Sequence, residues 1–334
     1  MIALLGASGA VGGHVLAGLR ARGLDVRTGS RQSGVDIRDD RSLAAFIDGA
    51  RLVINCAGPS HDTAARVARA AVRVGADYVD AGGDSDDAMV DAGDRTVLFA
   101  AGASPGLSGL LPRWLAGGFD EVRSLTAYSG VLDRFTWAGA EDFLSGTTEP
   151  GAAWREGRRR SGALSREHDV LLPYFERPVV ALPFLDRENE ATARQLSLVD
   201  GQWYSVVENG HLLRALDRAS GLPRERAVAA IRDAAALDVA GRSPHAILLI
   251  QLDGVRDRAP FTRTVAVRAD SVAALTAAVT VAAAVAVLSG EVPPGANRAG
   301  EVLPASVVEN IAGSGLTVSD ASIAELAPAE EGVL

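Results

Sequence analysis

Three glycines spaced three residues apart are the first feature of the sequence that could do chemistry. Gly6, Gly9 and Gly12 directly follow the apolar run at residues 2–5, which indicates a strand, a tight turn and then a helix. Glycine here lets backbone N–H groups approach a pyrophosphate, whose charge the helix N-terminus stabilises. Because Ser8 replaces the second glycine of the usual motif, a turn that binds nothing is the alternative. The predicted dinucleotide contacts are Gly6, Ser8, Gly9, Ala10, Val11 and Gly12.

The end of the second predicted strand, at residues 24–31, indicates which dinucleotide would bind. An NAD site usually carries an acidic residue about 20 positions after the glycine loop, where it binds the ribose 2′-hydroxyl. This sequence has Ser30 and Arg31 at that place. A guanidinium offers a planar fork of donors suited to a 2′-phosphate, so we expect NADP(H), unless Arg31 is an ordinary surface residue. Asp36 and Ile37 are predicted to lie along the adenine.

The segment NCAGPS at residues 55–60 follows a third apolar run. Ligands of open α/β sheets bind outside the carboxyl ends of the strands, so this loop should face the same ligand. Ala57, Gly58 and Pro59 are predicted to approach the ribose and the nicotinamide with their backbone. Cys56, which continues an apolar run, is interpreted as a small buried hydrophobe rather than a nucleophile.

Two patterns of secondary structure surround these loops. Strands alternate with helices through the first third of the chain, which predicts a doubly wound parallel sheet of Rossmann type. Beyond residue 118, long strands are expected without a helix between each pair, which indicates a second α+β domain with a mostly antiparallel open sheet. Those strands are expected at residues 121–131, 194–208, 245–255 and 262–269.

We therefore expect three parts in an α/β protein. Residues 1–118 form the cofactor domain, residues 119–270 a substrate-binding and dimerisation domain, and residues 271–334 a segment that packs back on the first domain. Between the strands, residues 149–169 are polar and basic, and we expect either a mobile lid or a solvated connection. The arginine run at 155–160 could meet an acidic partner or could simply be solvated.

Several motifs together resemble a known family. GASGAVGG, VINCAGPS, GADYVDAGGD and GASPGLSG occur in this order, followed near the end by LSGEVPPGANRAGEVLP. They resemble the saccharopine dehydrogenase-like reductases, whose N-terminal domain binds NADP. The resemblance covers residues 1–112 well and the tail moderately. It implies hydride transfer at C=N or C–N bonds, or at C=C bonds in some branches.

Residues 128–146 (YSGVLDRFTWAGAEDFLSG) are similar to reductases that act on thiazolinyl imines during siderophore assembly. Those enzymes reduce a thiazoline to a thiazolidine while a carrier protein of a synthetase holds the substrate. The resemblance thus implies a small-molecule or carrier-tethered substrate. Saccharopine itself is not expected, because the chain has no lysine and no evident pair of basic residues for a dicarboxylic amino acid.

Reduction of an imine requires a proton donor beside the hydride donor. His61, Asp84 and Tyr128 are the candidates, although each has a structural alternative: a surface residue in a helical first turn, a helix cap and a core tyrosine. Two other functions stay open. An enoyl reductase of the same fold would reduce C=C on a carrier-bound or lipid-like chain. A non-catalytic NADP sensor would bind the cofactor and a regulatory partner, although a sensor needs no large second domain.

Composition narrows these options further. The 334 residues carry a net charge of −9, which is unfavourable for binding nucleic acid or an anionic membrane. All 33 basic residues are arginines, which excludes Schiff-base chemistry. A single cysteine rules out an internal disulfide and fits a reducing cytoplasm. We expect neither a signal peptide nor a metal site, a buried core helix rather than a membrane span at 272–288, and a homodimer.

Overall fold

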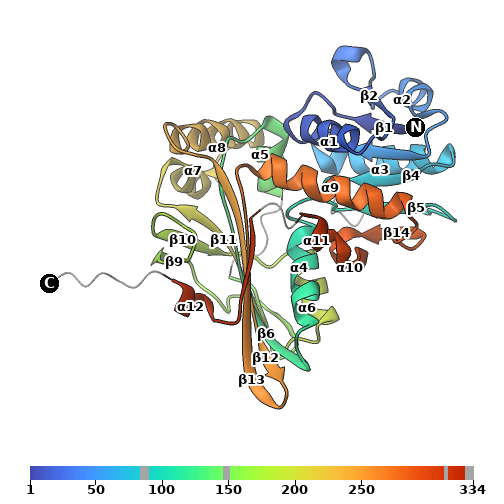
Figure 1. Cartoon of the computed structure of the whole chain (residues 1–334). Helices are drawn as coiled ribbons and strands as arrows, with labels where there is room; N and C mark the ends of the chain where they lie inside the picture. The colour runs from blue at the N-terminus through green and yellow to red at the C-terminus, as the bar shows by residue number, and fades with distance from the viewer. Residues whose placement is uncertain (83–89, 146–150, 312–314, 328–334) are drawn as a thin grey trace. The chain divides into compact units, whose positions relative to one another are not determined.

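The apolar runs beside the predicted loops form the strands of one parallel sheet. In this computed structural model, β1 (Ile2–Leu5) pairs with β2 (Val26–Gly29) on one side and with β3 (Leu52–Asn55) on the other. Beyond β3 the sheet continues with β4 (Asp77–Asp80), β5 (Thr96–Phe99) and β14 (Gly295–Arg298) (Figure 1). The structure describes all residues except 83–89, 146–150, 312–314 and 328–334. Because β2 and β3 lie on opposite sides of β1, the strand order reverses between β1 and β3.

Helices cover both faces of this sheet, so its central strands are buried on both sides. On one face, α2 (Asp40–Ile47) and α3 (Ser60–Arg73) pack against the alternate strand residues that include Val53 and Tyr78. On the other face lie α1 (Ala10–Ala21) and α9 (Val272–Leu288). All four residues of β1, β3 and β5 are buried, which explains their continuous apolar runs. The predicted doubly wound sheet is confirmed.

Helix α9 returns to this sheet from far along the sequence. Its residues 272–288 match the apolar stretch predicted as a buried helix, and most of them are buried. It lies along α1, where a β-carbon on Gly18 would be 3.0 Å from Val281 Cγ2. Two short helices, α10 (Ala299–Val302) and α11 (Ser306–Ile311), follow β14. Among the described residues, no helix combines the length and apolarity that crossing a bilayer requires.

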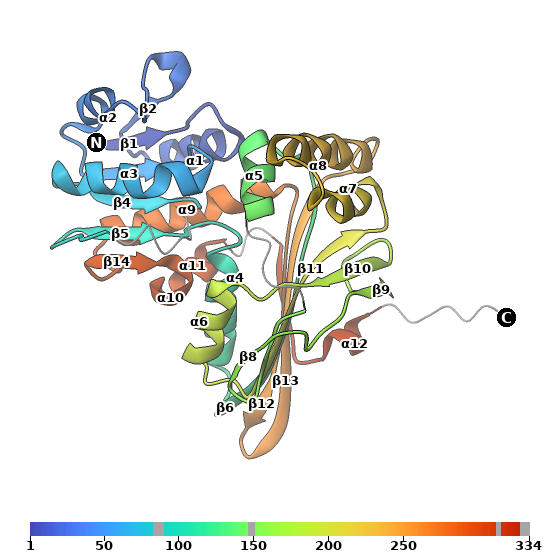
Figure 2. The ribbon, with the colours of Figure 1, turned by 180° about the vertical axis from the view of Figure 1, so that it is seen from behind.

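The second sheet is mixed and mostly antiparallel, as the sequence predicts. Its order is β15-β13-β12-β6-β11-β10-β9, and within the described part of the chain only the β6–β11 pair is parallel. The long strands β12 and β13 form a hairpin between β6 and the edge strand β15 (Figure 2). The strands are β6 (Glu121–Leu132), β9 (Glu167–Val170), β10 (Val179–Pro183), β11 (Asp200–Glu208), β12 (His245–Arg256), β13 (Ala259–Ala269) and β15 (Leu316–Ser319).

Three helices pack on one face of the second sheet. Apolar residues of α5 (Trp137–Ser145), α7 (His211–Ala219) and α8 (Arg224–Asp238) meet Val180 and Val207 of the strands. On the opposite face, a separate cluster includes Tyr204 and Ile323, the first residue of α12 (Ile323–Leu326). The remaining helices are α4 (Leu107–Ala116), α6 (Arg187–Gln195) and the short 3₁₀ turn η1 (Arg31–Ser33).

Residues 153–160 differ from the predicted loop. They form a hairpin of β7 (Ala153–Arg155) and β8 (Arg158–Arg160). Its two turn residues, Glu156 and Gly157, have φ angles of 52° and 71°, the left-handed conformation that two-residue hairpin turns require. The strand expected at 194–208 is also shorter, because α6 extends to Gln195 and β11 begins at Asp200.

The chain divides into two units at points that differ from the expected ones. The first unit holds residues Met1–Leu110 and Val272–Gly313, and the second holds Leu111–Ser271 and Ser314–Leu334. The tail does not pack wholly on the first domain, because β15 pairs with β13 of the second unit. The expected and observed positions of the tail differ because β15 pairs with β13, which lies about fifty residues earlier in the sequence, and such a pairing cannot be seen in the local sequence.

Candidate cofactor site

Two of the three loop glycines lie where no side chain fits. A β-carbon on Gly6 would be 2.6 Å from the backbone carbon of Cys56, and the φ angle of Gly6 is +77°. A β-carbon on Gly12 would be 2.1 Å from the carbonyl oxygen of Gly6. Both distances are far below van der Waals contact, so the loop after β1, the start of α1 and the loop after β3 touch through their backbones. Gly6 and Gly12 therefore serve the packing of these three segments.

Gly9 has a different environment. A β-carbon there would meet only the Gly6 oxygen, at 3.3 Å, and Ser8, Gly9 and Ala10 are exposed. Gly9 is the N-cap of α1, which has no side-chain cap and no acidic residue in its first turn. The first N–H groups of a helix have no partner within the helix, and they carry part of the positive end of its dipole. This end of α1 can accept an anion from solvent.

The residues after β2 present a free guanidinium. Ser30 caps η1, and its hydroxyl accepts a hydrogen bond from the Ser33 N–H at 3.3 Å. Arg31 is the first residue of η1 and is exposed; its side chain makes no hydrogen bond or ion pair within the described part of the chain. Both side chains therefore lie at the carboxyl end of β2, as predicted, and both are able to donate to a phosphate.

Asp36 and Ile37 form the turn that leads into α2. The Asp36 carboxylate accepts the Arg38 N–H at 2.9 Å, and the Asp36 N–H donates to Ser42 Oγ at 3.0 Å. Ile37 is half-buried and packs against the core between α2, α3 and the sheet. These bonds fix the turn, and a contact with adenine stays a prediction.

The loop after β3 lies against the glycine loop, at the reversal of strand order. The β-carbon position of Gly6 is also 2.7 Å from the Ala57 nitrogen, so two of the predicted groups of contacts meet here. Gly58 is exposed and Pro59 is the N-cap of α3, which again has no side-chain cap. Burial raises the pKa of the Cys56 thiol, which makes it a poor nucleophile, in line with its interpretation as a small hydrophobe.

The three candidate proton donors lie in different surroundings. His61 is exposed in the first turn of α3, with Nε2 3.4 Å from Asp62 Oδ1. Tyr128, in the second unit, stacks on Tyr204 with ring centroids 5.1 Å apart. Burial, followed by the nearby Glu167, raises the pKa of Tyr128 to about 12. Asp84 lies outside the described residues. The catalytic roles of all three residues stay predictions. Because its pKa is so high, Tyr128 serves more readily as a hydrogen-bond donor than as an acid.

Sequence reasoning missed a set of buried polar side chains beneath the loop after β3. Asn55 ends β3, Asp80 ends β4, and Thr63 lies in the first turns of α3. All three are buried and joined by hydrogen bonds. A signal was present in the sequence, because a polar residue ends each of two neighbouring apolar strands, and the carboxyl ends of parallel strands share one edge of the sheet.

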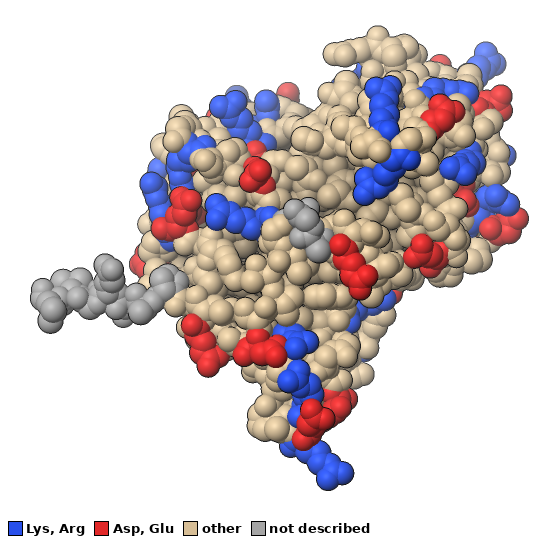
Figure 3. Space-filling model, in the orientation of Figure 1, with Lys and Arg blue, Asp and Glu red and all other residues tan. Residues whose placement is uncertain are grey.

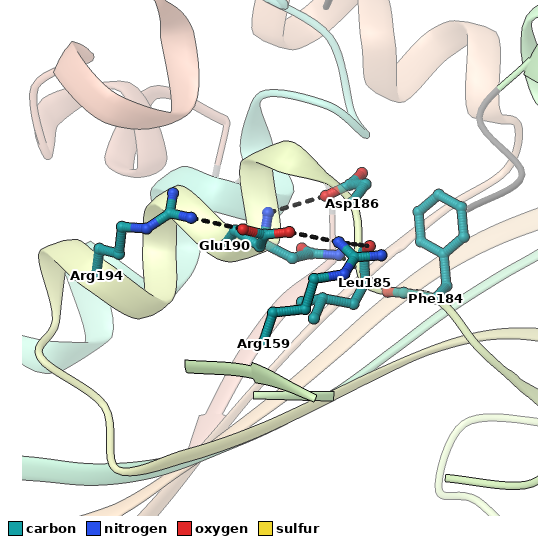
Figure 4. A network of polar contacts seen from close by, with 7 residues as sticks. Arg159, Phe184, Leu185, Asp186, Glu190 and Arg194 are labelled. Carbon is teal, nitrogen blue, oxygen red and sulfur yellow. Dashed lines mark hydrogen bonds and ion pairs between the residues drawn. The ribbon is translucent and has the colours of Figure 1, made fainter. Parts of the chain in front are cut away.

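The arginines of the β7–β8 hairpin have acidic partners within the chain. Arg159 binds Glu190, which also accepts a hydrogen bond from Arg194 at 2.5 Å (Figure 4). Arg160 binds Glu156 at 2.8 Å, and Arg158 is 3.8 Å from the same carboxylate. Acidic and basic side chains are likewise interspersed over the face in Figure 3. The attraction of this basic run for an acidic partner is therefore partly neutralised.

Comparisons with known proteins agree with this description. Residues 24–96 match the family model of the saccharopine dehydrogenase NADP-binding domain. The apo saccharopine dehydrogenase (L-Glu forming) of Saccharomyces cerevisiae superposes with a TM-score of 0.71 at 16% identity, covering 96% of this chain and 99% of that one. No curated protein matches the sequence.

Two further structures share the fold over most of their length. They are the C. glutamicum DAP dehydrogenase in complex with DAP (TM-score 0.50) and an engineered D-amino acid dehydrogenase bound to NADP⁺ (TM-score 0.51). Each is 16% identical, and each match covers 93% of this chain and 98% of the other. Residues 24–96 therefore match an NADP-binding domain, and the chain shares the fold of these dehydrogenases.

Proposed function

We propose that this chain is an NADPH-dependent reductase of a carbon–nitrogen double bond. The observation that carries the proposal is found at the reversal of strand order. The uncapped end of α1 follows a glycine loop that touches the loop after β3, and Arg31, at the carboxyl end of β2, makes no ion pair within the described residues. The N-terminus of α1 would take the pyrophosphate, and Ser30 and Arg31 the 2′-phosphate. The backbone of Ala57, Gly58 and Pro59 would lie along the ribose and nicotinamide.

The choice of C=N rests on the chemistry of the proteins with this fold. Saccharopine dehydrogenase, DAP dehydrogenase and D-amino acid dehydrogenase are all named for amino-acid substrates. Oxidation of an amine by hydride removal gives an imine, so reduction of an imine is the same reaction in reverse. The bound cofactor would supply the hydride. The chain must then orient the substrate and allow a proton to reach its nitrogen.

The sharper form of the proposal is a thiazolinyl imine attached to a carrier protein, reduced to a thiazolidine during siderophore assembly. Its support is the similarity of residues 128–146 to reductases of that kind. In the structure this segment includes the end of β6 and the helix α5. Because the arginines at 158–160 have acidic partners, the carrier protein would have to bind elsewhere or compete with those ion pairs.

Turnover of a thiazoline is the direct test. We expect tight binding of NADPH by fluorescence titration, followed by loss of reduced-nicotinamide absorbance when a thiazoline-containing mimic is added. Oxidation with an enoyl thioester and none with the imine would contradict the proposal and indicate C=C reduction. Tight NADPH binding without oxidation by either compound would instead indicate a sensor.

Gly9→Val tests the glycine loop. Its backbone, with φ −81° and ψ 169°, accepts a β-branched residue once the Gly6 oxygen, 3.3 Å from the β-carbon position, gives way by a few tenths of an ångström. The side chain would enter the space that a pyrophosphate needs. We expect NADPH and NADH binding to be lost, with little change in melting temperature. Gly13→Val is the matched control, because a β-carbon there meets nothing closer than 3.8 Å. Retained tight binding by Gly9→Val would show that the loop is only a turn.

Arg31→Asp tests the cofactor preference. The charged hydrogen bonds to a 2′-phosphate would be replaced by repulsion, so the Kd for NADPH should rise by at least about tenfold. The Kd for NADH should change little, since NADH has no 2′-phosphate. Arg41→Asp, an exposed charge reversal on α2, is the control. Unchanged discrimination between the two cofactors would remove Arg31 from the site.

The raised pKa of Tyr128 makes a prediction about pH. With a pKa of about 12, the phenol keeps its proton well above its usual range near 10, so it does not titrate between about pH 6 and 10. Profiles of kcat/KM against pH over this range should have the same shape for the wild type and for Tyr128→Phe. Loss of an alkaline limb in Tyr128→Phe would show that the pKa of Tyr128 is lower than the structure implies.

A further inference from the structure

Four polar side chains are enclosed beneath the loop after β3. Asn55, Thr63, Tyr78 and Asp80 are each at most 4% exposed. Polar groups buried at the end of an apolar sheet cost free energy unless hydrogen bonds replace those made with water. Apolar side chains at these places would carry no such cost. The pattern of their bonds therefore indicates what these residues do in the molecule.

Asp80 is the centre of this network. One carboxylate oxygen, Oδ2, accepts hydrogen bonds from Asn55 Nδ2 at 2.9 Å and from the Tyr78 hydroxyl. The other, Oδ1, accepts the Gly82 N–H at 2.8 Å. With donors on both oxygens, the carboxylate holds a fixed orientation and in turn fixes the amide of Asn55.

Asn55 and Thr63 hold the peptides on both sides of Ala57. Asn55 Oδ1 accepts the Ala57 N–H at 3.1 Å, while Thr63 Oγ1 donates to the Ala57 carbonyl at 2.8 Å. The two side chains also meet each other, with Asn55 Nδ2 3.3 Å from Thr63 Oγ1. Ala57 is thus restrained through its donor and its acceptor, although it belongs to neither a strand nor a helix.

The Ala57 peptide is confined by backbone contacts as well as by these hydrogen bonds. On its other side the same peptide lies against Gly6, whose β-carbon position is within 2.7 Å of the Cys56 carbon and the Ala57 nitrogen. The loop after β3 is therefore held between the glycine loop and the network. A shift of Ala57 would change the shape of the surface that both loops offer to a ligand.

We propose that Asn55, Thr63 and Asp80 are positioning residues that hold residues 56–59 in the shape that receives the nicotinamide half of NADP(H). The inference rests on the proposed function, which assigns that half of the cofactor to this loop. The network lies away from Ser30 and Arg31, which belong to the end of β2 on the other side of β1. Loss of a network bond should therefore affect the two halves of the cofactor unequally.

Thr63→Val tests this inference, because valine keeps the shape of threonine and removes the hydroxyl that binds the Ala57 carbonyl. We expect the Kd for NADPH to rise by about tenfold, the effect of losing one well-placed hydrogen bond. The Kd for adenosine 2′,5′-bisphosphate, which has no nicotinamide, should stay unchanged. Thr63→Ser, which restores the hydroxyl, should recover NADPH binding.

Thr96→Val is the matched control. Thr96 is also buried, and its hydroxyl donates to the Pro293 carbonyl at 3.4 Å. It is the first residue of β5, so it lies at the amino end of the strands, away from the loop after β3. It should bind both ligands like the wild type. Should Thr63→Val not fold, Thr63→Ala gives the same comparison with a smaller side chain.

The outcomes separate the two proposals. Equal weakening of NADPH and of adenosine 2′,5′-bisphosphate, or no weakening of either, would overturn the positioning role while leaving the cofactor site in place. Failure of the wild type to bind NADPH at all would instead contradict the proposed function.

Discussion

The backbone contact between Gly6, Gly12 and Cys56 is the constraint on which the first unit depends. Three segments from β1, α1 and β3 meet with no side chain between them. Only this close approach lets α1 begin directly beside the loop after β3, where the strand order of the sheet reverses. An open parallel sheet has its crevice at such a reversal, so the same contact that packs the fold also shapes the site. A substitution at Gly6 or Gly12 would disturb the packing of the fold together with the shape of the site. A substitution at Gly9 would change the site while leaving that packing in place.

Further along the same edge, polar bonds connect the loops. Asp80 links the loops after β3 and β4 through Asn55 and the Gly82 N–H. The Ala101 N–H donates to the Asp80 carbonyl at 2.8 Å, and the Ala100 N–H donates to the Gly82 carbonyl at 2.8 Å, which adds the loop after β5. Each loop at the carboxyl edge is thus fixed to its neighbour. Backbone packing does this between β1 and β3, and hydrogen bonds do it from β3 to β5.

The first sheet was predictable because each of its strands and helices is marked by residues within that segment of the sequence. Apolar runs of strand length alternate with helical segments, and glycines mark the loop after β1, so element type and order follow from the sequence. The second unit was harder. The hairpin at 153–160 was missed because Glu156 is unusual in a left-handed turn position, and the pairing of β15 with β13 depends on residues distant in sequence. The glycine spacing predicts a dinucleotide site at this loop, and that site stays a prediction. Only the distances in the structure distinguish the packing glycines, Gly6 and Gly12, from Gly9.

A chain with a net negative charge attracts an anionic cofactor only through positive groups placed close to it. With a net charge of −9, the chain as a whole repels an anionic cofactor at long range, although salt screens exposed charges beyond about 8 Å. Many of its arginines are already neutralised: Arg242 binds Glu208 through two hydrogen bonds of 2.5 and 2.7 Å, and Arg263 binds Asp320 at 2.6 Å. Arg31 has no such partner within the described residues. In a chain with 42 acidic residues, the folded structure leaves this guanidinium without an acidic partner among the described residues, so it keeps its full capacity to donate to an anion.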